Sequence, residues 1–258
     1  MTTAKPSTAL TTTKGEPVAL ADWAAAEKKK ILDDRASAQA RKDRMKFEEG
    51  INTARILPGR AGKPPFHKTF LHYLRNPNNP KQTKSVVCPL KTEGKPCILC
   101  AEVSKLRKTG NQVDQRAAGD LSAGMRVFAN VIDLSKVEEG VKVAEFGATI
   151  YVPLLGHLAA QDESSVGDFT DPDKGRNVVI EKTVGDPQNI KETTRYEVRM
   201  AQTSTPISNR KWLSELHDLS KAAEVIDEVK IKALLEGRDV DGEFASPDEV
   251  AAEVVSEK

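Results

Sequence analysis

The chain has 258 residues, of which 38% are hydrophobic, 5% aromatic and 30% charged. This length allows one large domain or one domain with appendages. The longest mostly apolar stretch, residues 148–160, is interrupted by polar residues and is shorter than the roughly 18 residues that a membrane-spanning helix needs. The N-terminus is rich in threonine and lacks the apolar core of a secretory signal. We therefore expect a protein of the cytoplasm that has no membrane partner.

Charge is divided unevenly along the chain, although 39 Lys plus Arg nearly balance 38 Asp plus Glu. Residues 41–116 hold 17 basic and 6 acidic residues, a net charge of +11, whereas residues 212–258 hold 5 basic and 13 acidic residues, a net charge of −8. Two regions of opposite charge are typical of a protein that binds a polyanion in one part and carries an acidic tail elsewhere. The alternative is that both runs are solvated helix faces.

Residues 1–50 are expected to form a basic N-terminal arm. Its first 21 residues are rich in Ser and Thr and poor in apolar residues, which predicts disorder. Asp22 is expected to cap a mostly polar helix that continues to Phe47 and stops at Gly50. We expect this helix to become fully ordered only against a partner or nucleic acid.

A domain that is mainly β with helices is expected from residue 51 to residue 236. Short runs rich in β-branched and aromatic residues alternate with turns at Pro, Gly and Asn. The predicted antiparallel strands are residues 51–57, 66–74, 125–134, 141–146, 178–184 and 196–201. Helices are expected at 97–109, 149–161, 210–217 and 219–235, a mobile loop at 110–124, and a long connection at 160–176. Residues 237–258 are expected to form a disordered acidic tail.

The three cysteines are gathered in one short segment. Eight residues separate Cys88 from Cys97, and two separate Cys97 from Cys100. A Cys-x-x-Cys spacing lets the backbone point both thiolates at one zinc ion, at about 2.3 Å. The fourth ligand is expected to be His67 or His72, which a regular strand would place on opposite faces because an odd step separates them. His72 lies nearer to Cys88 in the sequence.

Two interpretations compete with a zinc site, namely a redox pair and buried structural thiols. A redox Cys-x-x-Cys pair should follow a strand in a βαβ pattern, which is absent, and it would leave Cys88 without a role. A catalytic zinc would need an open coordination position, whereas three cysteines and one histidine fill the tetrahedron. We therefore favour one structural zinc ion in a subdomain at about residues 66–110.

A series of short motifs occurs in the order Arg55-Ile56-Leu57-Pro58, Pro65-Phe66 followed six residues later by His72, then Cys88, Cys97-x-x-Cys100 and Val127-Phe128-Ala129-Asn130. This series resembles the zinc-containing single-stranded DNA-binding (helix-destabilising) protein of T-even bacteriophages, over roughly residues 52–237. The resemblance implies an OB-fold core with a zinc subdomain whose ligands are His72, Cys88, Cys97 and Cys100. It also implies a function in coating single strands during phage DNA replication, recombination and repair.

The resemblance further implies that the basic arm supports self-association along DNA and that the acidic tail contacts replication proteins, such as a polymerase or a helicase loader. The sequence departs from the family in two respects. The family's binding groove is rich in tyrosine, whereas this chain has only three, and Val127-Phe128 replaces a Tyr-Trp pair. The family's arm has Ser-Thr after its basic cluster, where Lys30 is followed here by Ile31-Leu32.

The basic segment, the β domain and the closed zinc site together predict a sequence-independent single-strand binder, which needs an electrostatic groove and stacking surfaces. The alternative is a zinc-stabilised transcription-regulatory or RNA-binding module, although no predicted helix has one basic face with neighbouring Asn or Gln. An enzyme is not expected, because the basic segment shows no evident pairing of acidic residues. The candidate stacking residues are Tyr73 and Phe128, with the core as the alternative place for Phe128. The candidate phosphate contacts are Arg55, Arg75, Lys84, Arg107, Lys108 and Arg126.

Overall fold

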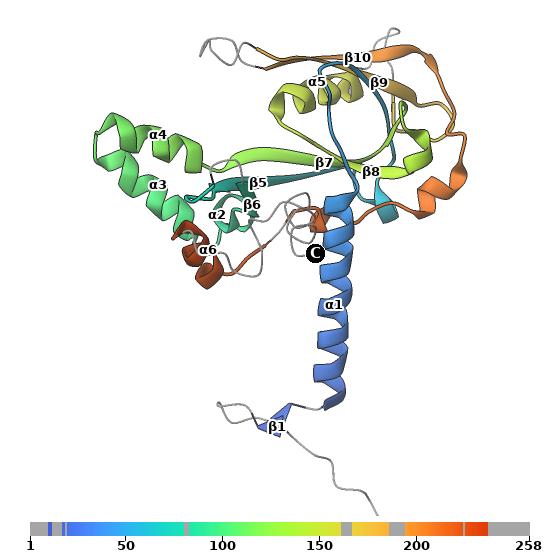
Figure 1. The fold of residues 1–258 in the computed structure, drawn as a ribbon. Coiled ribbons are helices and arrows are strands. Elements are labelled where there is room, and N and C mark those ends of the chain that lie inside the picture. Colours follow the sequence, from blue (N-terminus) through green and yellow to red (C-terminus); the bar gives the residue numbers. More distant parts are fainter. Residues whose placement is uncertain are drawn as a thin grey trace, which may run out of the picture.

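The computed structural model describes residues 10–11, 17–18, 20–79, 83–160, 167–185, 194–223 and 225–236. The predicted disorder of the acidic tail at 237–258, and of most of residues 1–21, concerns segments outside the described residues. Within 1–21 the structure instead has two short strands, at residues 10–11 and 17–18, and the start of a helix at Leu20. The described chain is a mixed α/β structure in which helices surround one eight-stranded sheet (Figure 1). No helix in this described part combines the length and the apolar character that crossing a membrane requires.

The sheet has the strand order β10-β9-β4-β7-β5-β6, and β8 pairs with β7 and, in parallel, with β3. One edge of β7 is shared, because residues 131–133 pair with β4 and residues 124–129 pair with β5. The sheet therefore divides at β7 into two arms, β4-β9-β10 and β5-β6. A separate pair joins β1 (Leu10–Thr11) to β2 (Pro17–Val18). The strands of the sheet are β3 (Arg44–Met45), β4 (Gly50–Ile56), β5 (Phe66–Arg75), β6 (Thr83–Val87), β7 (Gly124–Asp133), β8 (Val141–Phe146), β9 (Arg176–Thr183) and β10 (Arg195–Ser204).

All six predicted strands are present in the structure within a few residues of their expected bounds. Two further strands of the sheet, β3 and β6, were not predicted, and neither was the separate β1-β2 pair. The two residues of β3 are too few for a period-two pattern, and the first three residues of β6 are all polar.

Six α-helices and four 3-10 helices occur among the described residues. The α-helices are α1 (Leu20–Lys42), α2 (Pro89–Glu93), α3 (Ile98–Lys108), α4 (Gln112–Leu121), α5 (Ala148–Ala159) and α6 (Glu228–Leu235). The 3-10 helices are η1 (Arg60–Gly62), η2 (Val137–Glu139), η3 (Arg210–Ser214) and η4 (Leu219–Lys221). Figure 1 shows α1 projecting from the body of the protein. Its C-terminal end is anchored, because Ala40 is buried with Phe128 and Ala222.

The structure corrects three predicted segments. The expected loop at 110–124 contains α4, which begins after Asn111, whose side chain accepts a hydrogen bond from the Val113 amide. The helix expected to begin at an Asp22 cap and to reach Phe47 begins at Leu20, with Asp22 in its first turn, and ends at Lys42, because the next residues pair with β8 as β3. The predicted helices at 210–217 and 219–235 are replaced by η3, η4 and the short α6, and Asp227 caps α6 through the Lys230 amide.

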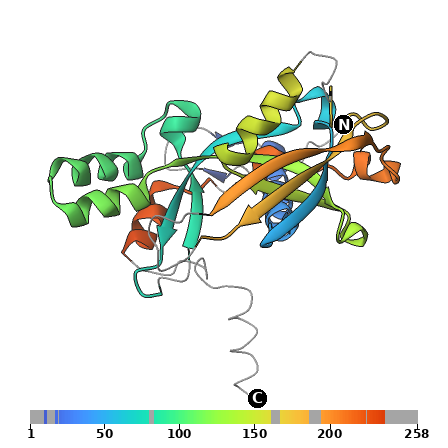
Figure 2. The same ribbon diagram turned by 90° about the horizontal axis from the view of Figure 1, so that it is seen from above.

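Two main apolar clusters hold the fold together. The larger one lies between the sheet and α5 and includes Ile56, Val127 and Leu154. The second lies in the β5-β6 arm, where Leu74 and Leu99 pack with Ile231 and Leu234 of α6. In the view from above, α6 lies beside this arm together with the α3-α4 helical pair (Figure 2). The second cluster contains two of the three cysteines, so it positions the candidate metal site.

Candidate metal centre and basic groove

The structure brings the four predicted metal ligands together. His72 lies on β5, Cys88 caps α2, Cys97 caps α3, and Cys100 lies in the first turn of α3. Their four ligand atoms all lie within 4.8 Å of one another. The His72 Nε2 atom is 3.4 Å from the Cys97 Sγ and 3.6 Å from the Cys100 Sγ, while the Cys88 and Cys100 sulfurs are 3.5 Å apart. Ligands about 2.3 Å from a tetrahedral ion lie about 3.7 Å from each other. The cluster can therefore hold a metal ion.

The orientation of His72 fits a ligand. Its Nδ1 atom lies 2.7 Å from the carbonyl oxygen of Leu121, the last residue of α4. Because a carbonyl only accepts, this bond places the proton on Nδ1 and leaves Nε2 with a lone pair that faces the sulfurs. His72 is fully buried, whereas His67 lines a different cavity. Of the two candidate histidines, His72 is the one that joins the cysteines.

Burial also shapes the chemistry of the thiols. It raises the pKa of Cys100 to about 12, and the neighbouring Cys88 and Cys97 sulfur groups add to this effect. A bound cation has the opposite influence, since coordination favours the thiolate. Lys91 contributes an amide that donates to the Cys88 Sγ at 3.4 Å. His72, Cys88 and Cys97 are buried, and Cys100 is half-buried. Three thiols and one imidazole supply all four ligands of a tetrahedral ion, which is the pattern of a structural site.

Two predicted nucleic-acid contacts are buried. Phe128 has 0% of its surface exposed and packs among Leu71, Val143 and Ala222. Its ring offers no face to a base, so it is a core residue in this structure. Arg55 is 3% exposed, and its Nη2 donates to the carbonyl oxygen of Asp171 at 2.6 Å. Its guanidinium has no surface for a phosphate.

Four other predicted contacts lie on the β5-β6 arm and on α3. Arg75 is exposed and forms an ion pair with Asp120 at 3.6 Å, and Arg107 donates to the Ser122 hydroxyl at 2.9 Å. Lys108, at the end of α3, is exposed, and Lys84 on β6 is half-buried. These four side chains are spread over β5, β6 and α3, and none of them lines the groove described next.

The remaining two predicted contacts, Tyr73 and Arg126, meet over Glu145. The Tyr73 hydroxyl donates to the Glu145 Oε1 at 3.1 Å, and the Arg126 Nε lies 3.5 Å from the same oxygen. Arg44 binds the other carboxylate oxygen of Glu145. Burial and this carboxylate raise the pKa of Tyr73 to about 12. Two guanidinium groups thus share one carboxylate, which leaves a net positive charge at this position.

Arg44, Arg126 and Glu145 line part of a groove of about 730 Å³. Its basic side chains are Arg44, Lys46, Arg126 and Lys182, against the acidic Glu48 and Glu145. Phe47 and Tyr196 add partly buried aromatic surface, and the amino end of α5 begins at its rim. Lys182 is held across the groove by a 2.7 Å hydrogen bond from its Nζ to the Phe47 carbonyl. The groove therefore combines an excess of positive charge with aromatic surface.

Sequence analysis identified only Arg126 among the basic residues of this groove. The others lie on β3, β9 and the segment after β3, which are far apart in the sequence. A local signal existed in Arg44-Met45-Lys46-Phe47, where basic and apolar residues alternate directly before a strand. These four residues, however, fall within the range predicted as helix. Lys182 and Tyr196 become recognisable only once β9 pairs with β4 and β10.

Comparison with known proteins adds no family assignment. No protein-family model matches the sequence, and no curated protein shows significant similarity to it. The chemistry of the metal cluster and of the groove therefore carries the functional argument.

Proposed function

We propose that this protein binds single-stranded DNA without sequence preference, through the groove lined by Arg44, Lys46, Arg126 and Lys182. The observation that carries the proposal is that these four cations surround two partly buried aromatic rings in one open groove. Cations attract the phosphates of any sequence, and an aromatic ring stacks on any base. Binding to single strands follows, because bases are free to stack only when they are unpaired.

The cations of the groove differ in how freely they can reach a phosphate. Lys46 is exposed, whereas Arg44 and Arg126 have only 20% and 34% of their side chains exposed and both contact Glu145. A phosphate that approaches these arginines competes with the Glu145 carboxylate. The affinity should therefore depend strongly on salt, since each phosphate contact releases counterions.

We propose a structural zinc ion as the occupant of the His72, Cys88, Cys97 and Cys100 cluster. Thiolate and imidazole ligands in a closed set of four suit Zn²⁺, and such a site stabilises a fold. When bound, the ion cross-links β5, α2 and α3. The three cysteines also pack in the second apolar cluster with Ile231 and Leu234 of α6, so the metal would hold the entire β5-β6 arm in place. We assign it no catalytic role.

We further propose an OB-fold core and a distant relationship to the single-stranded DNA-binding proteins of T-even phages. Two observations support this. The four residues that the resemblance implies as ligands meet in space, and the sheet, which is antiparallel except for the β3-β8 pair, branches at β7. Contacts with replication proteins through residues 237–258 and self-association along DNA through the N-terminal arm are part of the same proposal.

Charge-removing variants of the groove test the proposal. Lys46→Ala and Lys182→Ala should each weaken binding of a fluorescent oligo-dT, measured by anisotropy, and should each reduce the log-log salt slope by about 0.7. Lys174→Ala is the matched control, because Lys174 is exposed and lies outside the groove. Equal affinity of the control and both groove variants would show that the strand does not pass through this groove.

A further inference from the structure

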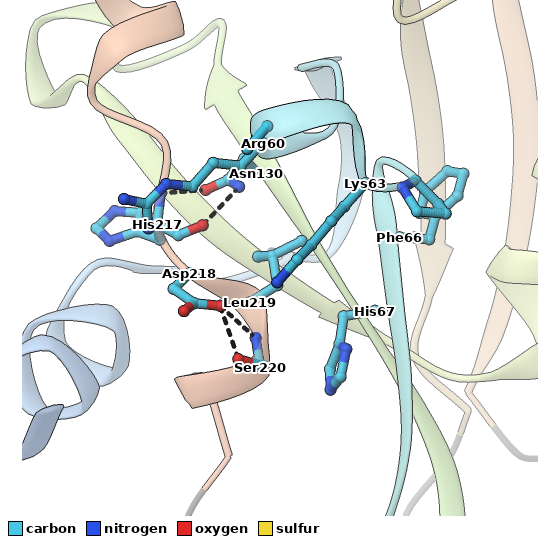
Figure 3. A pocket seen from close by; sticks show the side chains of 11 residues that line it. Arg60, Lys63, Phe66, His67, Asn130, His217, Asp218, Leu219 and Ser220 are labelled. Atoms are coloured by element: carbon cyan, nitrogen blue, oxygen red, sulfur yellow. Dashed lines mark hydrogen bonds between the residues drawn. The ribbon is translucent and has the colours of Figure 1, made fainter.

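A second cavity, of about 390 Å³, shares no residue with the basic groove. It lies between the turn that contains η1, the start of β5 and the segment that leads into η4 (Figure 3). Its size falls in the range of about 300–1,000 Å³ that is typical of small-molecule sites. No part of the proposed function uses this cavity.

The inner wall of the cavity is fixed by a closed set of hydrogen bonds. Asn130 is 2% exposed, and its Oδ1 accepts from the His217 amide at 2.9 Å while its Nδ2 donates to the His217 carbonyl at 3.1 Å. The His217 Nε2 lies 3.1 Å from the Val141 carbonyl. Asp218 accepts from the amide and the hydroxyl of Ser220 at 3.2 and 2.7 Å. Both of these hydrogen bonds use the same carboxylate oxygen, Oδ1. The polar wall is therefore organised before any ligand binds.

A tight turn places two cations at the mouth. Ala61 has φ 52° and ψ 44°, and it is the one non-glycine residue with positive φ in the described part of the chain. At Gly59 a Cβ atom would lie 1.6 Å from the Lys63 carbonyl oxygen, so only glycine fits there. The Lys63 amide closes the turn on the Arg60 carbonyl at 3.1 Å. Such an uncommon conformation at a ligand-sized cavity points to a function.

The two cations approach the cavity from the same side. In Figure 3 the Arg60 side chain extends toward His217, and the Lys63 side chain reaches toward Leu219. Lys63 is close enough to shift the titration of both His67 and Asp218. Burial lowers the pKa of His67 from its usual value, so that its ring is neutral at physiological pH. The cavity thus presents two cations, one carboxylate and a flat neutral ring.

This combination selects a ligand that carries both an anion and hydrogen-bond donors. A bare anion can pair with Arg60 and Lys63 but leaves the Asp218 carboxylate without a donor, and a simple amine is repelled by Arg60 and Lys63. A nucleotide satisfies both sides, because its phosphate is anionic and its base carries N–H donors and a flat face. We propose that this cavity binds one nucleotide, with its phosphate between Arg60 and Lys63 and its base between His67 and Leu219, donating to Asp218.

The nucleotide can be free in solution or can be the phosphorylated end of a strand, and calorimetric titration of the full chain separates these sources. The probes are dGMP, deoxyguanosine, inorganic phosphate, and a dG-ended oligonucleotide with and without its 5′-phosphate. Binding of dGMP supports a free nucleotide. Binding of the phosphorylated oligonucleotide with higher affinity than the unphosphorylated one, without dGMP binding, supports a strand end. The proposal is overturned if inorganic phosphate binds as well as dGMP, or if dGMP does not bind and the 5′-phosphate makes no difference.

Variants assign the binding to this cavity. Arg60→Ala and Lys63→Ala change exposed side chains, and each should weaken binding of the successful probe about tenfold. Lys174→Ala should leave it unchanged. Lys46→Ala in the groove should weaken oligo-dT binding but leave dGMP binding intact, so the two proposals can fail separately. Unchanged affinity in both Arg60→Ala and Lys63→Ala would overturn the assignment.

Discussion

The guanidinium of Arg126 lies over the ring of Tyr73, 5.1 Å from its centroid, and both side chains contact Glu145. A cation above an aromatic face gains about 0.5–2 kcal/mol, depending on its exposure. The pair is therefore held in place beside the groove. A phosphate that binds Arg126 must compete with one carboxylate, while Tyr73 stays fixed by the ring contact.

The phenol of Tyr73 should titrate abnormally. Burial and the Glu145 carboxylate raise its pKa from 10.0 to about 12. Between these two pH values the unfolded phenol has lost its proton and the folded one has not, so the free energy of unfolding should fall as pH rises from 10 to 12. A near-ultraviolet absorbance titration of the protein and of Tyr73→Phe isolates this phenol. If the Tyr73→Phe substitution removes a group that ionises near the ordinary pKa of 10.0, the contact between Tyr73 and Glu145 is contradicted.

Phe128 and Tyr196 should behave as opposites. Phe128→Ala removes a fully buried ring and should cost about 3–5 kcal/mol of unfolding free energy, measured by denaturant titration. Tyr196→Ala removes a half-buried ring of the groove and should weaken single-strand binding by about 1–3 kcal/mol with a much smaller stability loss. If Phe128→Ala is stable and binds weakly, then the core opens on binding, and our placement of the groove is wrong.

The metal site predicts near-stoichiometric zinc in purified protein. His72→Ala should lower the metal content strongly, and His67→Ala is the matched control because that ring lines the second cavity. The measurement is elemental analysis after dialysis. Equal zinc content in the two variants would remove His72 from the ligand set, and folded wild-type protein without metal would refute a structural zinc.

Chelation should have a local effect on the fold. Cys88 and Cys97 belong to the same apolar cluster as Leu99, Ile231 and Leu234, whereas β9 and β10 pack elsewhere. Loss of the metal should therefore increase hydrogen exchange in α3 and α6 and leave β9 protected. Uniform loss of protection would instead mean that the arm and the rest of the sheet unfold as one unit.

The acidic tail should compete with DNA for the basic surface. Residues 236–258 contain 8 acidic and 2 basic residues, and a tethered polyanion has a high effective concentration near its own domain. Removal of residues 237–258 should tighten single-strand binding, most clearly at low salt, where charges are least screened. Unchanged affinity at low ionic strength would show that the tail only adds solubility.

Local patterns were sufficient for the six longer strands of the sheet and for the three cysteines, and they narrowed the histidine ligand to His67 or His72. The Cys-x-x-Cys spacing and the alternation along β5 are local, and the structure confirms that Cys88, Cys97, Cys100 and His72 meet. The helix α4 was missed, although Asn111 is a good cap, because only tertiary packing fixes Ala118 in the core. Its last carbonyl, on Leu121, orients His72, and no spacing rule links residues 49 positions apart.

The groove could not be derived from charge alone. Arg55 and Arg126 have similar sequence surroundings, because each lies in a predicted strand directly after an apolar residue, Ala54 and Met125 respectively. Arg55 is buried against a carbonyl, and Arg126 reaches the groove. The difference depends on which neighbour covers each strand face, which is a property of the assembled sheet. The place of Phe128 also depends on the assembled sheet, because the guanidinium of Arg44 covers its ring at 4.7 Å from the centroid.

The most direct test of single-strand binding compares a fluorescent oligo-dT with a duplex of equal length, at two salt concentrations. We expect much tighter binding of the single strand, affinity that falls steeply with salt, and little change when oligo-dT is replaced by a mixed sequence. Equal affinity for duplex and single strand, or marked preference for one short sequence, would contradict the proposed function.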